Sequence, residues 1–237
     1  MDRLDKIIAE HSRYSRREAA DLIRRGRVTV NGAAVRDGAA KFDPETILLT
    51  VEGIALPLRQ HHTLMLNKPA GYVSATEDPR EKTVLELIRE EDRYPELFPA
   101  GRLDKDTTGL LLLTSDGGLC HRIISPRKEI WKTYLVTVEG RLEEADAAAV
   151  RNGIRLQSGE DLLPGELVIL ESAGVSRAEL RIREGKFHQV KRMMASLGKP
   201  VLHLKRTAVG GLALDEMLAP GEYKALTDRE IAQIFNG

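Results

Sequence analysis

The chain has 237 residues, 42% of them apolar, with 36 Lys/Arg and 36 Asp/Glu residues. This length suits one medium domain with a small one beside it. The longest aliphatic run, 110–113, is far too short for a membrane span, and the charged start 1–6 lacks the apolar core of a signal peptide, so a membrane protein is excluded and a cytoplasmic protein is expected. With Cys120 as the single cysteine, a disulfide framework and a thiolate zinc cluster are excluded as well.

The balanced net charge hides two basic segments. Residues 1–36 carry nine Lys/Arg against five Asp/Glu, and residues 181–206 carry eight against one. Separate basic surfaces on a neutral protein are typical of a protein that binds a polyanion. For either segment alone, a solvated charged face is an equally good interpretation.

The N-terminal segment predicts two helices and a hairpin. Apolar residues within 4–8 mark a first short helix. Ser15 and Glu18 have the spacing of a capping box, so a second helix should begin there and end near Gly26. The alternating run 28–30 then meets Asn31-Gly32, a strong hairpin signal because both residues tolerate positive φ.

This segment resembles the S4 RNA-binding domain in three motifs, which are Arg3-Leu4-Asp5-Lys6, Ser15-Arg16-Arg17-Glu18-Ala19 and Gly26-Arg27-Val28-Thr29-Val30-Asn31-Gly32. In that family an arginine-bearing helix face and the loop after it hold structured RNA, mostly through its backbone and shape. The resemblance implies the following RNA contacts, each of which could also be an ordinary surface arginine: Arg13, Arg16, Arg17, Arg24, Arg25 and Arg27.

The remainder of the chain predicts a larger second domain. Residues 52–62 lose clear periodicity and are predicted to be a connector, which divides the chain into domains 1–59 and 60–237. Strands are expected at 63–69, 110–114, 132–139, 166–170 and 178–183, and helices after Thr83, after Asp116, at 143–151, at 188–197 and after Thr227. Because strands and helices are mixed without regular βαβ alternation, an α+β domain with a mainly antiparallel mixed sheet is predicted.

One predicted loop contains candidate catalytic carboxylates. Its sequence is Gly101-Arg102-Leu103-Asp104-Lys105-Asp106-Thr107-Thr108-Gly109, and four leucines follow directly. A polar loop next to a rigid buried strand can present a carboxylate in a fixed position. Read locally, the loop could be a turn in which an aspartate bonds its own backbone. Extended through residues 110–117, however, this sequence resembles the characteristic motif of the RluA and RsuA pseudouridine synthase families. The resemblance implies a pseudouridine synthase catalytic domain with Asp104 as its catalytic aspartate.

Two further motifs resemble motifs of the same pseudouridine synthase families. Trp131-Lys132-Thr133-Tyr134-Leu135-Val136 implies that Tyr134 packs on the target uracil and is a candidate for relaying the C5 proton, although a lone strand tyrosine is more often structural. Gly185-Lys186-Phe187-His188-Gln189-Val190-Lys191-Arg192-Met193 implies that Lys191 is the basic partner of Asp104. Cations in a first helical turn oppose the helix dipole, which also indicates a functional role.

The resemblance also implies a set of substrate contacts. Leu204 would bound the uracil pocket, and Arg102 would help to hold the displaced nucleotide. The remaining residues expected to contact RNA are Lys186, His188, Gln189, Arg192, Lys205 and Arg206. His188 and His203 are not expected to bind metal, because no carboxylate or cysteine accompanies them at ligand spacing.

The reaction that the resemblance implies needs no cofactor, since isomerising uridine involves no redox change and no external energy. His188-Gln189 stands where the sister large-subunit enzymes of the RsuA/RluB/E/F family tend to carry Asn-Arg, which favours the RsuA type and a uridine in 16S rRNA of the small ribosomal subunit. The expected partner is 16S rRNA or a small-subunit assembly intermediate, bound by a monomer. The alternatives are a non-catalytic RNA-binding protein and, less favoured, a glycosidase suggested by Asp104 and Asp106.

Overall fold

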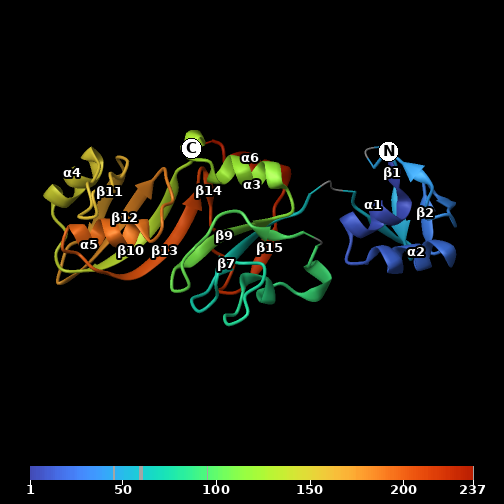
Figure 1. Cartoon of the computed structure of the whole chain (residues 1–237), viewed down its shortest axis with the longest axis horizontal. Helices are drawn as coiled ribbons and strands as arrows, with labels where there is room; N and C mark the ends of the chain where they lie inside the picture. Colours follow the sequence, from blue (N-terminus) through green and yellow to red (C-terminus); the bar gives the residue numbers. More distant parts are fainter. Residues whose placement is uncertain (45, 59–60, 95, 237) are drawn as a thin grey trace. The chain divides into compact units, whose positions relative to one another are not determined.

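The computed structural model describes residues 1–44, 46–58, 61–94 and 96–236 and divides into two compact units (Figure 1). One unit comprises Met1–His62 together with Ile88–Leu97, and the other comprises Thr63–Leu87 together with Phe98–Gly237. The predicted boundary between residues 59 and 60 lies outside the described residues. Among those that are described, no helix is long and apolar enough to cross a membrane.

The N-terminal unit has the predicted two helices and hairpin. Its elements are α1 (Leu4–His11), α2 (Arg16–Arg24), β2 (Val28–Val30), β3 (Ala33–Ala34), β5 (Leu49–Val51), β6 (Ile54–Leu56), the short pair β1 (Asp2–Arg3) and β4 (Lys41–Phe42), and the 3-10 turn η2 (Glu90–Asp92). The capping box at Ser15 and Glu18 is confirmed, since each side chain accepts a hydrogen bond from the backbone N–H of the other. Asn31 and Gly32 have φ of 51° and 81°, as a tight primed hairpin requires.

The connector prediction for residues 52–62 is wrong in part. Ile54–Leu56 forms β6, which pairs with β5 after a second tight turn at Glu52-Gly53, where φ is 53° and 82°. Periodicity fails here because Ile54 and Ala55 are both exposed, so the strand lacks the buried-to-exposed alternation that marks a half-buried strand.

The second unit is built on one mixed sheet, which confirms the predicted α+β class. In the described part of the chain the strands follow the order β11-β12-β10-β13-β9-β7-β15, with β8 on β9 and β14 on β13. Pairing is antiparallel except between β13 and β9. The bounds are β7 (Thr63–Lys68), β8 (Phe98–Pro99), β9 (Thr108–Thr114), β10 (Lys132–Glu139), β11 (Glu166–Glu171), β12 (Val175–Ile182), β13 (Val201–Val209), β14 (Leu212–Ala213) and β15 (Tyr223–Ala225).

The sheet has two halves, one formed by β11, β12, β10 and β13 and the other by β9, β7 and β15, and helices pack against both (Figure 1). They are α3 (Gly117–Ile124), α4 (Glu144–Asn152), α5 (Gln189–Ser196), α6 (Asp228–Gln233) and the 3-10 turns η1 (Val84–Leu87) and η3 (Pro126–Lys128). α3 contacts β9, α4 contacts β11, α5 contacts β13 and α6 contacts β14. The helix expected after Thr83 is only the turn η1, because the backbone becomes extended at Arg89.

The two halves of the sheet meet at a short parallel junction. β9 and β13 are in register at only two pairs, Thr108 with Lys205 and Gly109 with Arg206. Gly109 has a φ of 96°, and a Cβ added there would overlap the backbone of Arg206. Glycine is therefore required at the point where the loop carrying Asp104 enters the sheet.

Replacing Gly109 tests this junction. Gly109→Ala should lower the free energy of unfolding more than Gly71→Ala, a matched control with a φ of 94° and open space around it. The control should cost about 1 to 3 kcal/mol from backbone conformation. Gly109→Ala should cost about 1 to 3 kcal/mol more because the new methyl overpacks the junction. Urea unfolding monitored at Trp131, the single tryptophan, measures both; equal losses would contradict the account.

Candidate active site

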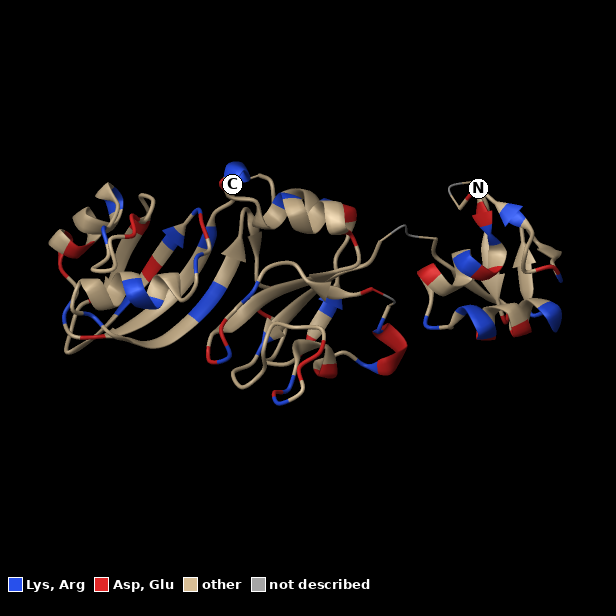
Figure 2. Ribbon diagram, viewed as in Figure 1, with Lys and Arg blue, Asp and Glu red and all other residues tan. Residues whose placement is uncertain are grey.

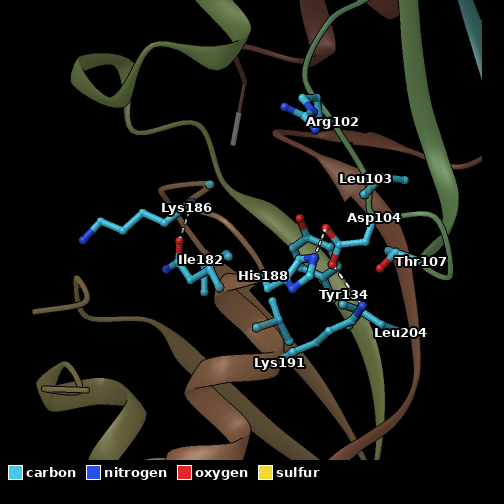
Figure 3. Close-up of a pocket in the computed structure, with 13 residues that line it drawn as sticks. Arg102, Leu103, Asp104, Thr107, Tyr134, Ile182, Lys186, His188, Lys191 and Leu204 are labelled. Carbon is cyan, nitrogen blue, oxygen red and sulfur yellow. Dashed lines mark hydrogen bonds and ion pairs between the residues drawn. The ribbon is translucent and has the colours of Figure 1, made fainter. Parts of the chain in front are cut away.

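Asp104 lies in the loop between β8 and β9, with its carboxylate between two residues from the start of α5 (Figure 3). The Lys191 Nζ atom lies 3.0 Å from Asp104 Oδ2, and the His188 Nε2 atom lies 3.5 Å from Oδ1. The Asp104 side chain is 27% exposed, so one part of the carboxylate is held by protein while the rest is open to a ligand.

Lys191 joins two carboxylates. Its Nζ atom also lies 2.6 Å from Asp106 Oδ1. Burial alone would lower the pKa of Lys191, but hydrogen bonds and charge from Asp106 and Asp104 outweigh it and raise the pKa. The hydrogen bond from Lys191 in turn lowers the pKa of Asp106. The cluster is therefore an ammonium between carboxylates at neutral pH.

A second lysine holds the loop from behind. Lys68, at the end of β7, is 0% exposed, and its Nζ atom donates to the carbonyl oxygens of Pro69, Asp104, Lys105 and Thr107 at 2.9–3.2 Å. Burial lowers the pKa of Lys68 to about 8, against the opposing charges of Asp106 and Asp104, so the ammonium is still the main form at neutral pH. Sequence reasoning missed this role, although a lysine at the end of a buried strand was a signal, because buried lysines are rare unless paired.

A pocket opens beside the carboxylate. Tyr134 on β10 and Leu204 on β13 are both buried, and they line it together with Leu103 and Thr107 from the loop. Tyr134 and Leu204 come from neighbouring strands, paired at Val136 with Leu204 and at Tyr134 with Arg206. The structure thus brings the predicted residues Asp104, Tyr134, Lys191 and Leu204 to one place.

Several predicted RNA contacts in the segment 184–192 are turned toward the protein instead. Glu184 is buried, and its carboxylate accepts from Leu163 N at 2.9 Å and from Gln189 Nε2 at 2.8 Å. Lys186 Nζ donates to Asp161 O at 2.7 Å and lies 3.3 Å from the Glu184 carboxylate. Arg192 is paired with Glu160. This network fixes the start of α5, and with it His188 and Lys191.

Two of the residues predicted to contact RNA are buried. Gln189 is 3% exposed, and its amide bonds Glu184 and the backbone N–H of Lys186, so it organises the loop while it also lines the pocket. Arg206 is 5% exposed, and its Nε atom donates to Leu110 O at 2.7 Å across the β9–β13 junction. A tertiary contact decides the direction of Arg206, whereas bonds within its own loop decide that of Gln189.

The remaining predicted contacts are accessible. Arg102 is on the rim of the pocket but points away from Asp104 (Figure 3), and Lys205 is exposed on β13. In the N-terminal unit, Lys and Arg lie along α2 (Figure 2). The six arginines expected to contact RNA there are all exposed, namely Arg13, Arg16, Arg17, Arg24, Arg25 and Arg27. Within the described residues, no group of three or more His, Cys, Asp or Glu side chains could hold a metal ion.

Comparison with known proteins defines the family. The RNA pseudouridylate synthase model matches residues 62–196, and the S4 domain model matches residues 2–48. The chain therefore belongs to the RNA pseudouridylate synthase family and carries an N-terminal S4 domain. This confirms the fold and the enzyme class that the sequence predicted.

Relatives match along almost the whole chain. The ribosomal small subunit pseudouridine synthase A of Escherichia coli K12 is 46% identical over 235 residues, 98% of this chain and 99% of that protein. An uncharacterized RNA pseudouridine synthase of Bacillus subtilis is 42% identical over 230 residues, 97% of this chain and 96% of that protein. A crystal structure of a pseudouridylate synthase superposes with a TM-score of 0.68 at 40% identity, covering 99% of this chain and all of the other.

Replacing Lys68 tests the support of the Asp104 loop. Lys68→Met keeps the length of the side chain but removes the ammonium from four carbonyl groups, of which those of Asp104 and Lys105 keep a backbone donor. The free energy of unfolding should fall by about 3 kcal/mol, because buried acceptors lose a charged partner. The turnover number kcat should fall at least roughly tenfold, since a small displacement of a catalytic group is costly.

Lys105→Met is the matched control for this test. Lys105 lies in the same loop, but its side chain is half exposed and its ammonium pairs with Glu81 at the surface. The control should change the free energy of unfolding by no more than about 0.5 kcal/mol. If Lys68→Met is as stable and as active as Lys105→Met, the loop does not depend on Lys68.

Proposed function

We propose that this enzyme converts one uridine in 16S rRNA of the small ribosomal subunit to pseudouridine, acting as a cytoplasmic monomer without a cofactor. The observation that carries the proposal is the ion pair of Asp104 with Lys191 beside the pocket lined by Tyr134 and Leu204. The choice of 16S rRNA is supported by the name of the Escherichia coli relative and by its match over nearly the full length of both chains.

The reaction breaks the bond between N1 of uracil and C1′ of ribose, turns the base, and joins C5 to C1′. Substrate and product have the same composition, so no oxidant, reductant or energy source is consumed. Asp104 acts either as a nucleophile on the ribose or base, or as a base at C2′. Both routes use the carboxylate of Asp104, and the Lys191 ammonium lies 3.0 Å from its Oδ2 atom.

Tyr134 and Leu204 have complementary roles in this proposal. The buried Tyr134 ring packs on the uracil and holds it while the glycosidic bond is broken, and its hydroxyl group relays the proton that leaves C5. Leu204, on the neighbouring strand, bounds the other side of the pocket. A non-catalytic RNA-binding protein would have no need of these buried groups around a paired aspartate.

The RNA has to be delivered with its target base unstacked. The glycosidic bond is inaccessible within a helix, so the uridine is flipped into the pocket, and Arg102 on the rim holds the displaced backbone. The exposed arginines of the S4 domain bind structured rRNA through its phosphates, as do Lys205 and the accessible part of Lys186. His188 faces the carboxylate from α5 and contacts the bound nucleotide.

Replacing the aspartate tests the proposed function. Asp104→Asn should bind 16S rRNA with an affinity within about threefold of the wild type, because the side chain keeps its size and the basic surfaces are intact. Pseudouridine formation should fall by at least roughly a thousandfold, since the ionised group is lost. Filter binding and pseudouridine mapping of 16S and 23S rRNA incubated with each variant measure the two effects.

Asp106→Asn provides the matched control. Asp106 shares Lys191 with Asp104, but its side chain is 72% exposed. This variant should lose no more than roughly tenfold in rate, because an exposed ion pair contributes little. Product formation by Asp104→Asn at the wild-type rate would remove Asp104 from its role. Modification of 23S rRNA alone by the wild type would overturn the proposed substrate.

A further inference from the structure

The turn before α5 exposes an aromatic ring. Phe187 is 74% exposed, although its neighbours Lys186 and Gln189 bond to the protein. Its ring stacks on the ring of His188, with a centroid distance of 3.8 Å and an angle of 18° between the planes. His188 lines the pocket, so the exposed ring of Phe187 continues a two-ring stack that begins there.

The backbone imposes this exposure. His188 has a φ of 46° and a ψ of 34°, a left-handed conformation that is unfavourable for a residue with a side chain. Hydrogen bonds on both sides hold it there. Arg192 Nε donates to Phe187 O at 2.8 Å, and the side chain of Gln189 accepts from Lys186 N at 2.9 Å. Local strain that the surroundings maintain is characteristic of functional sites.

The stack begins at the catalytic carboxylate. His188 Nε2 lies 3.5 Å from Asp104 Oδ1, and the His188 ring carries Phe187. A nucleotide whose base occupies the pocket at Asp104 has its neighbours in the strand at the pocket rim. When the uridine is flipped out, those neighbouring bases lose a stacking partner, and an aromatic ring can replace it.

We propose that Phe187, supported by His188, is a stacking platform for the nucleobase next to the target uridine. The ligand is an unpaired base of the same RNA strand, of any sequence, because every base has a π face. This inference rests on the proposed function and adds to it a contact on the substrate. It also assigns the grip on the flanking base to the aromatic pair, in place of the polar side chains of Lys186 and Gln189.

The experiment is a double-mutant cycle between Phe187 and the flanking bases. An rRNA fragment that the wild type converts is prepared intact and with an abasic site on the 5′ or the 3′ side of the target. All binding measurements use full-length enzyme carrying Asp104→Asn, which prevents turnover. Removing the stacked base should weaken binding by the Phe187-containing enzyme roughly tenfold, and binding by Phe187→Ala less than twofold, because both changes delete the same contact.

Conservative variants separate stacking from simple apolar contact. In enzyme with Asp104 intact, Phe187→Ala should raise KM roughly tenfold with a small change in kcat, and Phe187→Leu should do the same because it has no π face. Phe187→Tyr and Phe187→Trp should restore KM to within about twofold. Met217→Ala, which truncates another exposed apolar side chain of the same unit, should behave as the wild type.

The inference is overturned if each abasic site weakens binding equally with and without Phe187, or if Phe187→Leu matches the wild type. Either outcome leaves the proposed function intact as long as the wild type makes pseudouridine in the small-subunit fragment. Failure of the wild type to modify any small-subunit RNA would overturn the proposed function itself.

Discussion

The candidate active site depends on one ion pair between the two halves of the sheet. Asp104 belongs to the loop that enters β9, whereas Lys191 belongs to α5, which packs on β13. Within the described residues, backbone pairing between these two halves is limited to the short parallel junction at Thr108–Lys205 and Gly109–Arg206. The contact of Lys191 with Asp104 and Asp106 therefore both places an ammonium beside the Asp104 carboxylate and joins the two halves at the pocket.

Two lysines stabilise this loop through different groups. Lys68 bonds its backbone carbonyl groups from the buried side, and Lys191 bonds its carboxylates from the open side. Neither position can be exchanged for the other, because carbonyl oxygens need a donor inside the protein whereas the carboxylate must stay accessible to the nucleotide. In the proposed reaction, a loop that has little freedom of its own thus presents the aspartate to the substrate.

Sequence reasoning succeeded where the signal was local. Each of these signals lies in a short run of residues: the capping box at Ser15, the Asn31-Gly32 turn, and the motifs around Asp104, Tyr134 and Lys191. It did not predict the direction of side chains that contacts within the fold decide: Arg206 turns inward to Leu110 across the parallel junction, and the amide of Gln189 bonds to the buried Glu184. The role of Lys68 was missed because three of its four partners, Asp104, Lys105 and Thr107, are more than thirty residues away.

The most direct test of this account replaces the ammonium that bridges the two halves. In single-turnover reactions with 16S rRNA, Lys191→Met should form pseudouridine about 100-fold more slowly or worse, because the carboxylate loses its preorganised charged partner. Its RNA affinity should stay within about threefold of the wild type, since Lys191 is occupied by Asp104 and Asp106. A folded Lys191→Met enzyme that reacts at the wild-type rate would contradict the account.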